Sequence, residues 1–362
     1  MPPNFPALTS VRGLAAWWVV LYHFRVELTQ VQWHTLQVFA SYGYLAVDLF
    51  FVMSGFVIAL NYEGSMRELT WPKVARFLGF RLARIYPLHL VILIAFLANP
   101  VAILLFSSNG VPGDRYDPAY YFLSLALIQN WGLSPLLAWN IPAWSISTEW
   151  AGYLLFPCLA WASSRFISRS IHAVAVVACM LVLLAMFGRL NGDLGNNIPQ
   201  AALIRCLLEF TMGIAFYRFW LLQKQSYPDG NAMLGVALAV LIGGAAMHWP
   251  DYIFAPIGLL LLIVSLVDGR SVGARLLNNK ALIYVGEISY STYLVHYLVK
   301  DWIKFVLLRD GVSSETVLAA YIGVTAVASV CLYHWIELPG RRVGRERVNA
   351  WLSPPKVSGT YR

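Results

Sequence analysis

Ten runs of mostly apolar residues, nine of them about 17 to 24 residues long and one of about 15, constrain this chain more than any other feature. An α-helix needs about 20 such residues to cross the roughly 30 Å hydrocarbon core of a bilayer. Inside lipid, the backbone N–H and C=O groups of such a segment must pair within the helix. We therefore predict an all-α, polytopic transmembrane helix bundle of about ten spans, at residues 8–27, 42–61, 87–106, 143–163, 171–187, 199–222, 232–249, 253–267, 281–300 and 316–336.

Composition agrees with a membrane protein, because 59% of the residues are hydrophobic and only 12% are charged. Soluble domains are about one quarter charged. The first run lacks a cleavage site of small residues, so we expect a retained span and not a signal peptide. The cysteines lie inside apolar runs without metal-ligand spacing, which predicts core packing and no metal site: Cys158, Cys179, Cys206 and Cys331.

The distribution of Lys and Arg predicts the topology. With ten spans, 19 of these residues fall on the side of the two termini and 6 on the other side. Cytoplasmic loops carry the excess of positive charge, so both termini should be cytoplasmic. This asymmetry also explains the net charge of +8, and we expect no nucleic-acid partner.

One membrane domain is predicted over residues 1–338, followed by a cytoplasmic basic tail over 339–362. The outer connection 107–142 contains an apolar segment, 120–130, that is too short to cross comfortably. A re-entrant or interfacial helix fits this segment better than a span. No appended soluble domain is expected at either end.

Ionisable residues inside the spans predict a functional site. Arg12 begins the first apolar run and His23 follows eleven residues later, roughly 16 Å further along a helix. His23, Asp48, Glu149 and His296 lie on four spans at a similar depth in the outer half of the membrane. A buried ionisable group costs about 2.5 kcal/mol or more in lipid, so such residues usually have a function.

A second group of charged residues lies toward the cytoplasm. Arg81 and Arg84 are three residues apart, which puts both guanidinium groups on one helical face just before the proline that starts the third span. Paired arginines suit phosphate recognition. The alternatives are a topology signal for this pair and snorkelling of Arg12 toward the interface.

Structural alternatives also apply to the outer group. His23 could bond a neighbouring carbonyl, Glu149 could cap the start of its helix, and His296 could hydrogen-bond a tyrosine. Asp48 has only apolar neighbours in sequence and needs a partner inside the bundle. Arg205 and Glu209, four residues apart on one span, are expected to pair with each other for structural reasons.

Several motifs together resemble the acyltransferase family 3 membrane proteins, in the order of that family and over almost the whole chain. They are Arg12-x10-His23, Gly43-Tyr-Leu-Ala-Val-Asp48-Leu-Phe-Phe-Val-Met-Ser54-Gly55-Phe56, Arg81-x2-Arg84-Ile-Tyr-Pro87, Trp144-Ser-Ile-Ser-Thr-Glu149 and Ile288-Ser-Tyr-Ser-Thr-Tyr293-Leu-Val-His296. The resemblance implies transfer of an acyl group, commonly acetyl, from cytoplasmic acyl-CoA to a carbohydrate or other hydroxyl acceptor. It also implies functional roles for Arg12, His23, Arg81 and Arg84.

A mechanism follows from the two groups of residues. Arg81, Arg84 and Arg12 would bind the phosphates of acyl-CoA, here acetyl-CoA, and His23 would act as general base on the acceptor hydroxyl. Asp48 or Glu149 would fix the imidazole tautomer. An acyl-histidine intermediate is an open alternative. Possible substrate-site residues are His296, Tyr293, Trp144 and Ser147.

Two other classes of membrane protein also place polar residues at this depth. One is a proton-coupled transporter or flippase of a glycan or lipid intermediate, although the chain shows no repeat of its first half in its second. The other is a lipid- or glycan-binding subunit without catalysis. For the enzyme we expect a carbohydrate or glycolipid acceptor, contact with membrane lipid, and a bacterial inner membrane as location.

Overall fold

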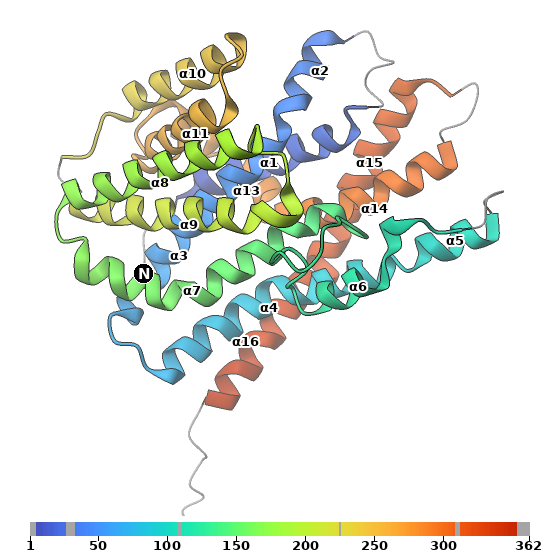
Figure 1. Cartoon of the computed structure of the whole chain (residues 1–362), viewed down its shortest axis with the longest axis horizontal. Coiled ribbons are helices and arrows are strands. Elements are labelled where there is room, and N and C mark those ends of the chain that lie inside the picture. The colour runs from blue at the N-terminus through green and yellow to red at the C-terminus, as the bar shows by residue number, and fades with distance from the viewer. Residues whose placement is uncertain (1–4, 27–32, 107–110, 224–225, 308–311, 353–362) are drawn as a thin grey trace, which may run out of the picture.

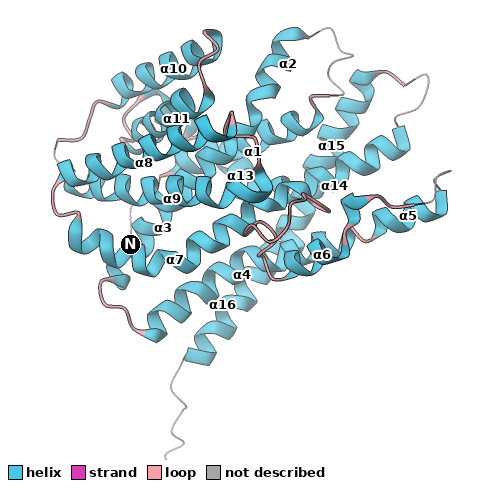
Figure 2. Ribbon diagram, in the orientation of Figure 1, coloured by secondary structure: helices cyan, strands magenta, loops and turns pink. Residues whose placement is uncertain are grey.

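The protein is described by a computed structural model that places residues 5–26, 33–106, 111–223, 226–307 and 312–352. Within these ranges all regular structure is helical, as Figure 2 shows, which confirms the all-α fold. In chain order the elements are α1 (Pro6–Phe24), α2 (His34–Ser41), η2 (Tyr42–Leu45), α3 (Ala46–Met66), α4 (Trp71–Ala95), α5 (Ala98–Phe106), η3 (Asp114–Tyr116), α6 (Pro118–Leu125), η4 (Ile141–Ala143), α7 (Trp144–Phe166), α8 (Ser170–Asn191), α9 (Ile198–Leu222), α10 (Gly230–Ala246), α11 (Asp251–Val267), α12 (Val272–Leu277), α13 (Lys280–Glu287), α14 (Ser289–Leu307), α15 (Ser314–Leu332), η5 (Tyr333–Glu337) and α16 (Leu338–Leu352).

Long apolar helices make this an integral membrane protein. Among the described residues, five helical segments are long and apolar enough to cross a bilayer: 34–66, 71–106, 170–191, 198–222 and 314–352. Two further apolar helices, α10 and α11, are shorter. The membrane helix bundle is therefore confirmed, while the count of about ten spans stays a prediction.

The third predicted span begins well before its proline. Helix α4 starts at Trp71, so Pro87 lies inside the helix and does not start it. Arg81 and Arg84 consequently lie in the middle of a continuous helix. Neighbouring helices allow prolines inside membrane helices, and here Gly340 of α16 packs directly on the Pro87 ring.

The ninth predicted span is divided. Helices α13 and α14 meet at Ile288, just after Gly286 has come against the backbone of α1. A Cβ on Gly286 would overlap the carbonyl oxygen of Thr9, so only glycine allows this approach. Figure 1 shows α1 between α10 and α11 on one side and α14 and α15 on the other. The start of α14 is thereby fixed against the first helix.

A buried ion pair joins α3 to α9. Arg205 Nε and Nη2 donate to the two carboxylate oxygens of Asp48 at 2.7 and 2.5 Å, and both side chains are 1% exposed. Arg205 Nη1 also donates to the carbonyl oxygen of Leu194 at 2.7 Å. The prediction that Arg205 pairs with Glu209 is wrong, because the guanidinium reaches across to α3 and not along its own helix.

The connection between α6 and α7 enters the bundle instead of covering its surface. Asn130 is 1% exposed, and its backbone N–H donates to Ser147 Oγ at 3.2 Å. Ser147 Oγ donates in turn to the carbonyl oxygen of Leu127 at 2.9 Å, and Trp131 Nε1 donates to the carbonyl oxygen of Ser147. Among the described residues of the connection 107–142, the one α-helix is α6, which is eight residues long and covers only the first part of the predicted segment.

The predicted basic tail starts as part of a helix. Helices α15 and α16 are continuous through the π-helical turn η5, so the boundary at 338 falls inside regular structure. Helix α16 packs along α4, where Gly344 meets the side chain of Ala83 and Gly79 meets Val348. Figure 1 shows α16 beside α4. Pro354 and Pro355 of the predicted tail lie outside the described residues.

We expect Asp48→Asn to lower the free energy of unfolding by about 3–5 kcal/mol, because it leaves a buried guanidinium without its counter-charge. The melting midpoint of the purified protein in detergent measures this. The double variant Asp48→Leu/Arg205→Met should recover most of the loss, since it removes both charges. Asp114→Asn, at an exposed position in η3, is the matched control. An unchanged midpoint for Asp48→Asn would contradict a structural role for the pair.

Candidate active site

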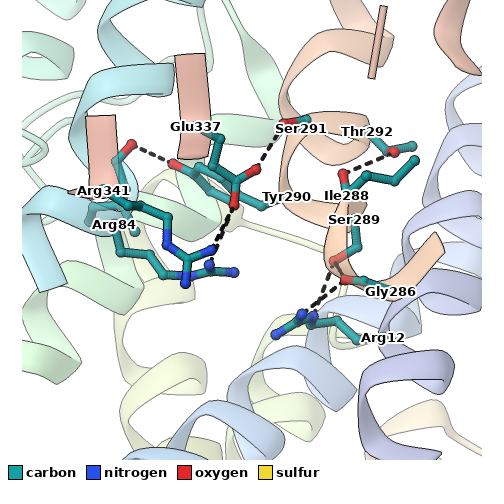
Figure 3. A network of polar contacts seen from close by, with 11 residues as sticks. Arg12, Arg84, Gly286, Ile288, Ser289, Tyr290, Ser291, Thr292, Glu337 and Arg341 are labelled. Atoms are coloured by element: carbon teal, nitrogen blue, oxygen red, sulfur yellow. Dashed lines mark hydrogen bonds and ion pairs between the residues drawn. The ribbon is translucent and has the colours of Figure 1, made fainter. Parts of the chain in front are cut away.

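Contacts between α1 and the junction of α13 and α14 position Arg12. Its Nη2 donates to the carbonyl oxygen of Gly286 at 2.9 Å, and its Nε donates to Ser289 Oγ at 3.1 Å. Figure 3 shows the guanidinium of Arg12 beside these two groups. The close approach at Gly286 therefore sets the place of this arginine.

A carboxylate that the sequence analysis missed lies between two other arginines. Glu337, in the π-helical turn η5, is 1% exposed. Its Oε1 lies 3.4 Å from Arg84 Nη1 and 3.7 Å from Arg341 Nη1, while Ser291 Oγ donates to its Oε2 at 2.8 Å. Figure 3 shows this carboxylate pointing toward both guanidinium groups. Glu337 thus joins α4, α14 and α16.

The three arginines predicted to bind phosphate, Arg12, Arg81 and Arg84, line one cavity. This inner cavity has a volume of about 160 Å³. Arg81 donates from Nη2 to Tyr62 Oη at 3.0 Å, while its buried Nε has no hydrogen-bond partner among the described residues. An unsatisfied buried donor of this kind suits a polar ligand. Lining residues that carry polar groups are Arg12, Ser54, Arg81, Arg84, Ser145, Glu149, Tyr153, Ser289, Tyr290 and Tyr293.

Two histidines from α1 and α14 meet at the centre of the bundle. His296 Nε2 lies 3.2 Å from His23 Nδ1, and the ring centroids are 5.0 Å apart. His23 Nδ1 also lies 3.1 Å from the carbonyl oxygen of Val19. His296 Nδ1 lies 3.3 Å from the carbonyl oxygen of Thr292. The partner of His23 is therefore a second histidine.

For two neutral rings, one tautomer assignment satisfies all three contacts. His296 Nδ1–H donates to Thr292, and its Nε2 then accepts from His23 Nδ1–H, which also faces Val19. The opposite assignment would place ring lone pairs against carbonyl oxygens. In the favoured assignment, His23 Nε2 carries a lone pair and can accept a proton.

The two predicted carboxylate partners of His23 lie elsewhere. Asp48 pairs with Arg205, and Glu149 Oε1 accepts from Ser54 Oγ at 2.5 Å inside the inner cavity. Neither makes a described hydrogen bond to His23. The predicted common depth does not specify which way each side chain faces around its helix axis.

The four possible substrate-site residues fall into two groups. His296 contacts His23, and Tyr293 lines the inner cavity, where its hydroxyl lies 2.8 Å from Ser145 Oγ. Trp144 instead packs beneath Arg205, whose Cζ lies 5.8 Å from the centroid of the tryptophan ring. Ser147 anchors the connection before α7. The structure thus brings together only the first two.

A second cavity lies between α5, η3 and the end of α14. This outer cavity has a volume of about 430 Å³ and is lined by Asn99, Ala102, Ile103, Arg115, Tyr116, Tyr297, Lys300, Asp301, Trp302, Lys304 and Phe305. Arg115 forms a short ion pair with Asp301. Burial lowers the pKa of Arg115, but Asp301 and Tyr297 outweigh burial and raise that pKa, so the cation persists.

The histidine pair lies between the two cavities. Tyr293 of the inner cavity is 5.9 Å from His296, and Tyr297 of the outer cavity is 5.2 Å from His23, by ring centroids. The site therefore offers an arginine-lined cavity, a central base and a separate basic cavity. No cluster that could hold a metal ion occurs among the described residues. Such an arrangement can move a proton while two ligands approach from different sides.

Sequence reasoning missed Glu337 and the outer cavity. Glu337 lies next to a run of arginines, in the sequence Glu337-Leu-Pro-Gly-Arg341, which reads as the start of a polar tail. It also follows directly after the predicted span 316–336, and its burial is seen only in the structure. The outer cavity depends on α5 returning to the end of α14, which no local pattern indicates.

Comparison with known proteins gives three matches of interest. Residues 5–335 match a family model described as "Acyltransferase domain". "Acyltransferase MdmB" of Streptomyces mycarofaciens is 28% identical over 98% of this chain and 97% of its own length. "O-acetyltransferase OatA" of Staphylococcus aureus (strain NCTC 8325 / PS 47) is 24% identical over 99% of this chain, which spans 60% of OatA. No solved structure matches the chain.

We expect Glu337→Gln to lower the free energy of unfolding by roughly 3 kcal/mol, since it removes the charge between two partly buried arginines. Melting midpoints in detergent measure the effect. Glu346→Gln, which breaks only an exposed pair with Arg342 on the same helix, should change stability by less than about 0.5 kcal/mol. Equal effects of the two substitutions would refute the assigned role of Glu337.

Proposed function

Because the chain belongs to the acyltransferase domain family, whose model matches residues 5–335, we propose that it is an acyl-CoA-dependent acyltransferase. It transfers an acyl group, here acetyl, from cytoplasmic acyl-CoA to a carbohydrate hydroxyl. The family model and MdmB are described as acyltransferases, and OatA is named an O-acetyltransferase, which supports acyl transfer to an oxygen. One observation supports both acyl-CoA as the donor and the proposed mechanism. The arginine-lined inner cavity adjoins the His23–His296 pair through Tyr293.

The inner cavity supports CoA as the donor. Arg12, Arg81 and Arg84 come from two different helices and line one space, where guanidinium groups can bind phosphate oxygens in pairs. The unsatisfied Nε of Arg81 is available for this purpose. Arg12 and His23 lie roughly 16 Å apart along α1, a distance comparable with the reach of the pantetheine arm. The thioester would then reach the histidine pair while the phosphates stay at the arginines.

His23 Nε2 is the general base in this proposal. It accepts the proton of the acceptor hydroxyl as the hydroxyl oxygen attacks the thioester carbonyl carbon. The C–S bond then breaks, and the proton passes to the leaving CoA thiolate. His296 holds the tautomer of His23, the positioning role that the sequence analysis assigned to Asp48 or Glu149.

The proposed orientation of the chain in the membrane follows from the distribution of its Lys and Arg residues. The excess of Lys and Arg on the side of the termini supports cytoplasmic termini and an inner cavity open to that side. The outer cavity then faces the opposite side, where an envelope or exported glycan would serve as acceptor. A bacterial inner membrane is the location that this arrangement favours.

We expect His23→Ala to lower acyl transfer about 10²–10⁴-fold, the usual contribution of a general base, while CoA binding persists. Membranes that contain each variant receive acyl-labelled acetyl-CoA, and the label is followed in the glycan and lipid fractions. His34→Ala, at an exposed position on α2, is the control. Unchanged transfer by His23→Ala would remove His23 from the mechanism.

We expect Arg81→Gln/Arg84→Gln to weaken CoA binding about 100-fold or more, because each of the two lost charged hydrogen bonds contributes about 1.5–3 kcal/mol. Equilibrium binding of labelled CoA to the purified protein measures this. Arg76→Gln, at an exposed position on the same helix, should bind CoA like the unaltered protein. Normal binding by the double variant would exclude these arginines as the phosphate site.

A further inference from the structure

Two neighbouring arginines at the start of α16 lie in different surroundings. The side chain of Arg342 is 80% exposed, and its Nε donates to Glu346 Oε1 at 3.1 Å. The side chain of Arg341 is only 29% exposed and points toward the buried Glu337, as Figure 3 shows. A topology signal requires positive charge near the cytoplasm but no particular face of a helix. The inward position of Arg341 therefore calls for a local explanation.

The ion pair with Glu337 leaves the hydrogen-bonding capacity of Arg341 unused. Arg84 Nη1 and Arg341 Nη1 lie 3.4 and 3.7 Å from the same carboxylate oxygen, Glu337 Oε1. That oxygen makes no hydrogen bond to a described residue. Neither arginine donates a hydrogen bond elsewhere within the described ranges. The N–H groups of both guanidinium groups are therefore available for a ligand.

Positive charge exceeds negative charge around this carboxylate. Arg84 and Arg341 repel each other, and both repel Arg12. The cations of the inner cavity and of the Glu337 contacts are Arg12, Arg81, Arg84 and Arg341, and the carboxylates there are Glu149 and Glu337. An anionic ligand would balance this excess, as charges in a protein interior require.

Close packing of α16 on α4 holds Arg341 level with Arg84. Gly340, the residue before Arg341, lies against the ring of Pro87, where a Cβ would come 2.6 Å from Pro87 Cβ. Arg84 lies about one turn before this proline on α4. The helix contact therefore brings an arginine of α16 beside an arginine that lines the inner cavity.

We propose that Arg341 of α16 joins Arg84 in binding a phosphate group of the acyl-CoA donor. This role rests on the proposed function and adds a binding residue from the region predicted to be a basic tail. The two side chains are 20% and 29% exposed, so a phosphate can reach them while Glu337 stays buried. Guanidinium groups bind phosphate oxygens through paired N–H donors, which suits two arginines that share one carboxylate.

Binding of CoA to the purified full-length protein in phosphatidylcholine nanodiscs tests this site. Arg341→Gln should weaken CoA binding about tenfold or more, because it loses charged hydrogen bonds to phosphate. Glu337 keeps Arg84 and Ser291 as partners, so we expect this variant to fold. Arg342→Gln removes the charge of the next residue and should bind CoA like the unaltered protein. Unchanged binding by Arg341→Gln would overturn the proposal.

Inorganic diphosphate separates a phosphate contact from an indirect effect on structure. It should raise the melting midpoint of the unaltered protein more than that of Arg341→Gln, since it carries phosphate groups without the rest of CoA. Equal shifts in both proteins would mean that Arg341 acts without binding phosphate. If Arg341→Gln does not fold, Arg341→Lys replaces it. Loss of the paired donors should still weaken CoA binding, and unchanged binding would again contradict the site.

Two further measurements separate this site from a lipid contact and from the proposed function. A loss of CoA binding in phosphatidylglycerol nanodiscs but not in phosphatidylcholine would assign Arg341 to a lipid headgroup and overturn the donor site. In transfer assays, Arg341→Gln should raise KM for acetyl-CoA about tenfold with kcat nearly unchanged, as for a residue that only binds the donor. Normal binding by the variant would contradict this inference alone. Absence of CoA binding by the unaltered protein would contradict the proposed donor as well.

Discussion

Charges inside this bundle need partners, and that requirement organises the structure. A charged group in a low-dielectric interior loses its hydration and must recover it from counter-charges and hydrogen bonds. Asp48 is held by Arg205, and Glu63 lies 3.4 Å from Arg218. Each pair connects α3 to α9, whose backbones come so close that a Cβ on Gly55 would overlap the carbonyl oxygen of Phe210. The ion pairs and the close backbone contact thus stabilise the same helix pair.

The central site differs from these pairs because it needs no net charge. His23 and His296 can satisfy each other and two backbone carbonyl oxygens as neutral rings. The cationic groups lie in the two cavities on either side, where Arg84 pairs with Glu337 and Arg115 pairs with Asp301. This separation suits a reaction in which charge develops only briefly at the base, apart from the permanent charges that line the cavities.

Local sequence pattern predicts the helices and the depth of each polar residue, but not the direction in which a side chain points. The three-residue spacing of Arg81 and Arg84 places both on one face, and the structure has both lining the inner cavity. Asp48 and His23 have the same predicted depth, yet their partners are Arg205 and His296. That difference depends on how the helices are rotated against each other. Such rotation follows from packing at distant positions, which one sequence does not reveal.

The rotation of α14 about its axis affects both cavities and the histidine pair. Tyr293, His296 and Tyr297 all come from this helix, so its register places one wall of each cavity and one histidine at once. A slip of one residue would turn the helix by about 100° and separate His296 from His23. The register is set ten residues earlier, where Gly286 meets α1 and Arg12 donates to its carbonyl oxygen. Arg12 therefore helps to place His296 and also lines the inner cavity, so a substitution at Arg12 is expected to affect both the histidine pair and the cavity.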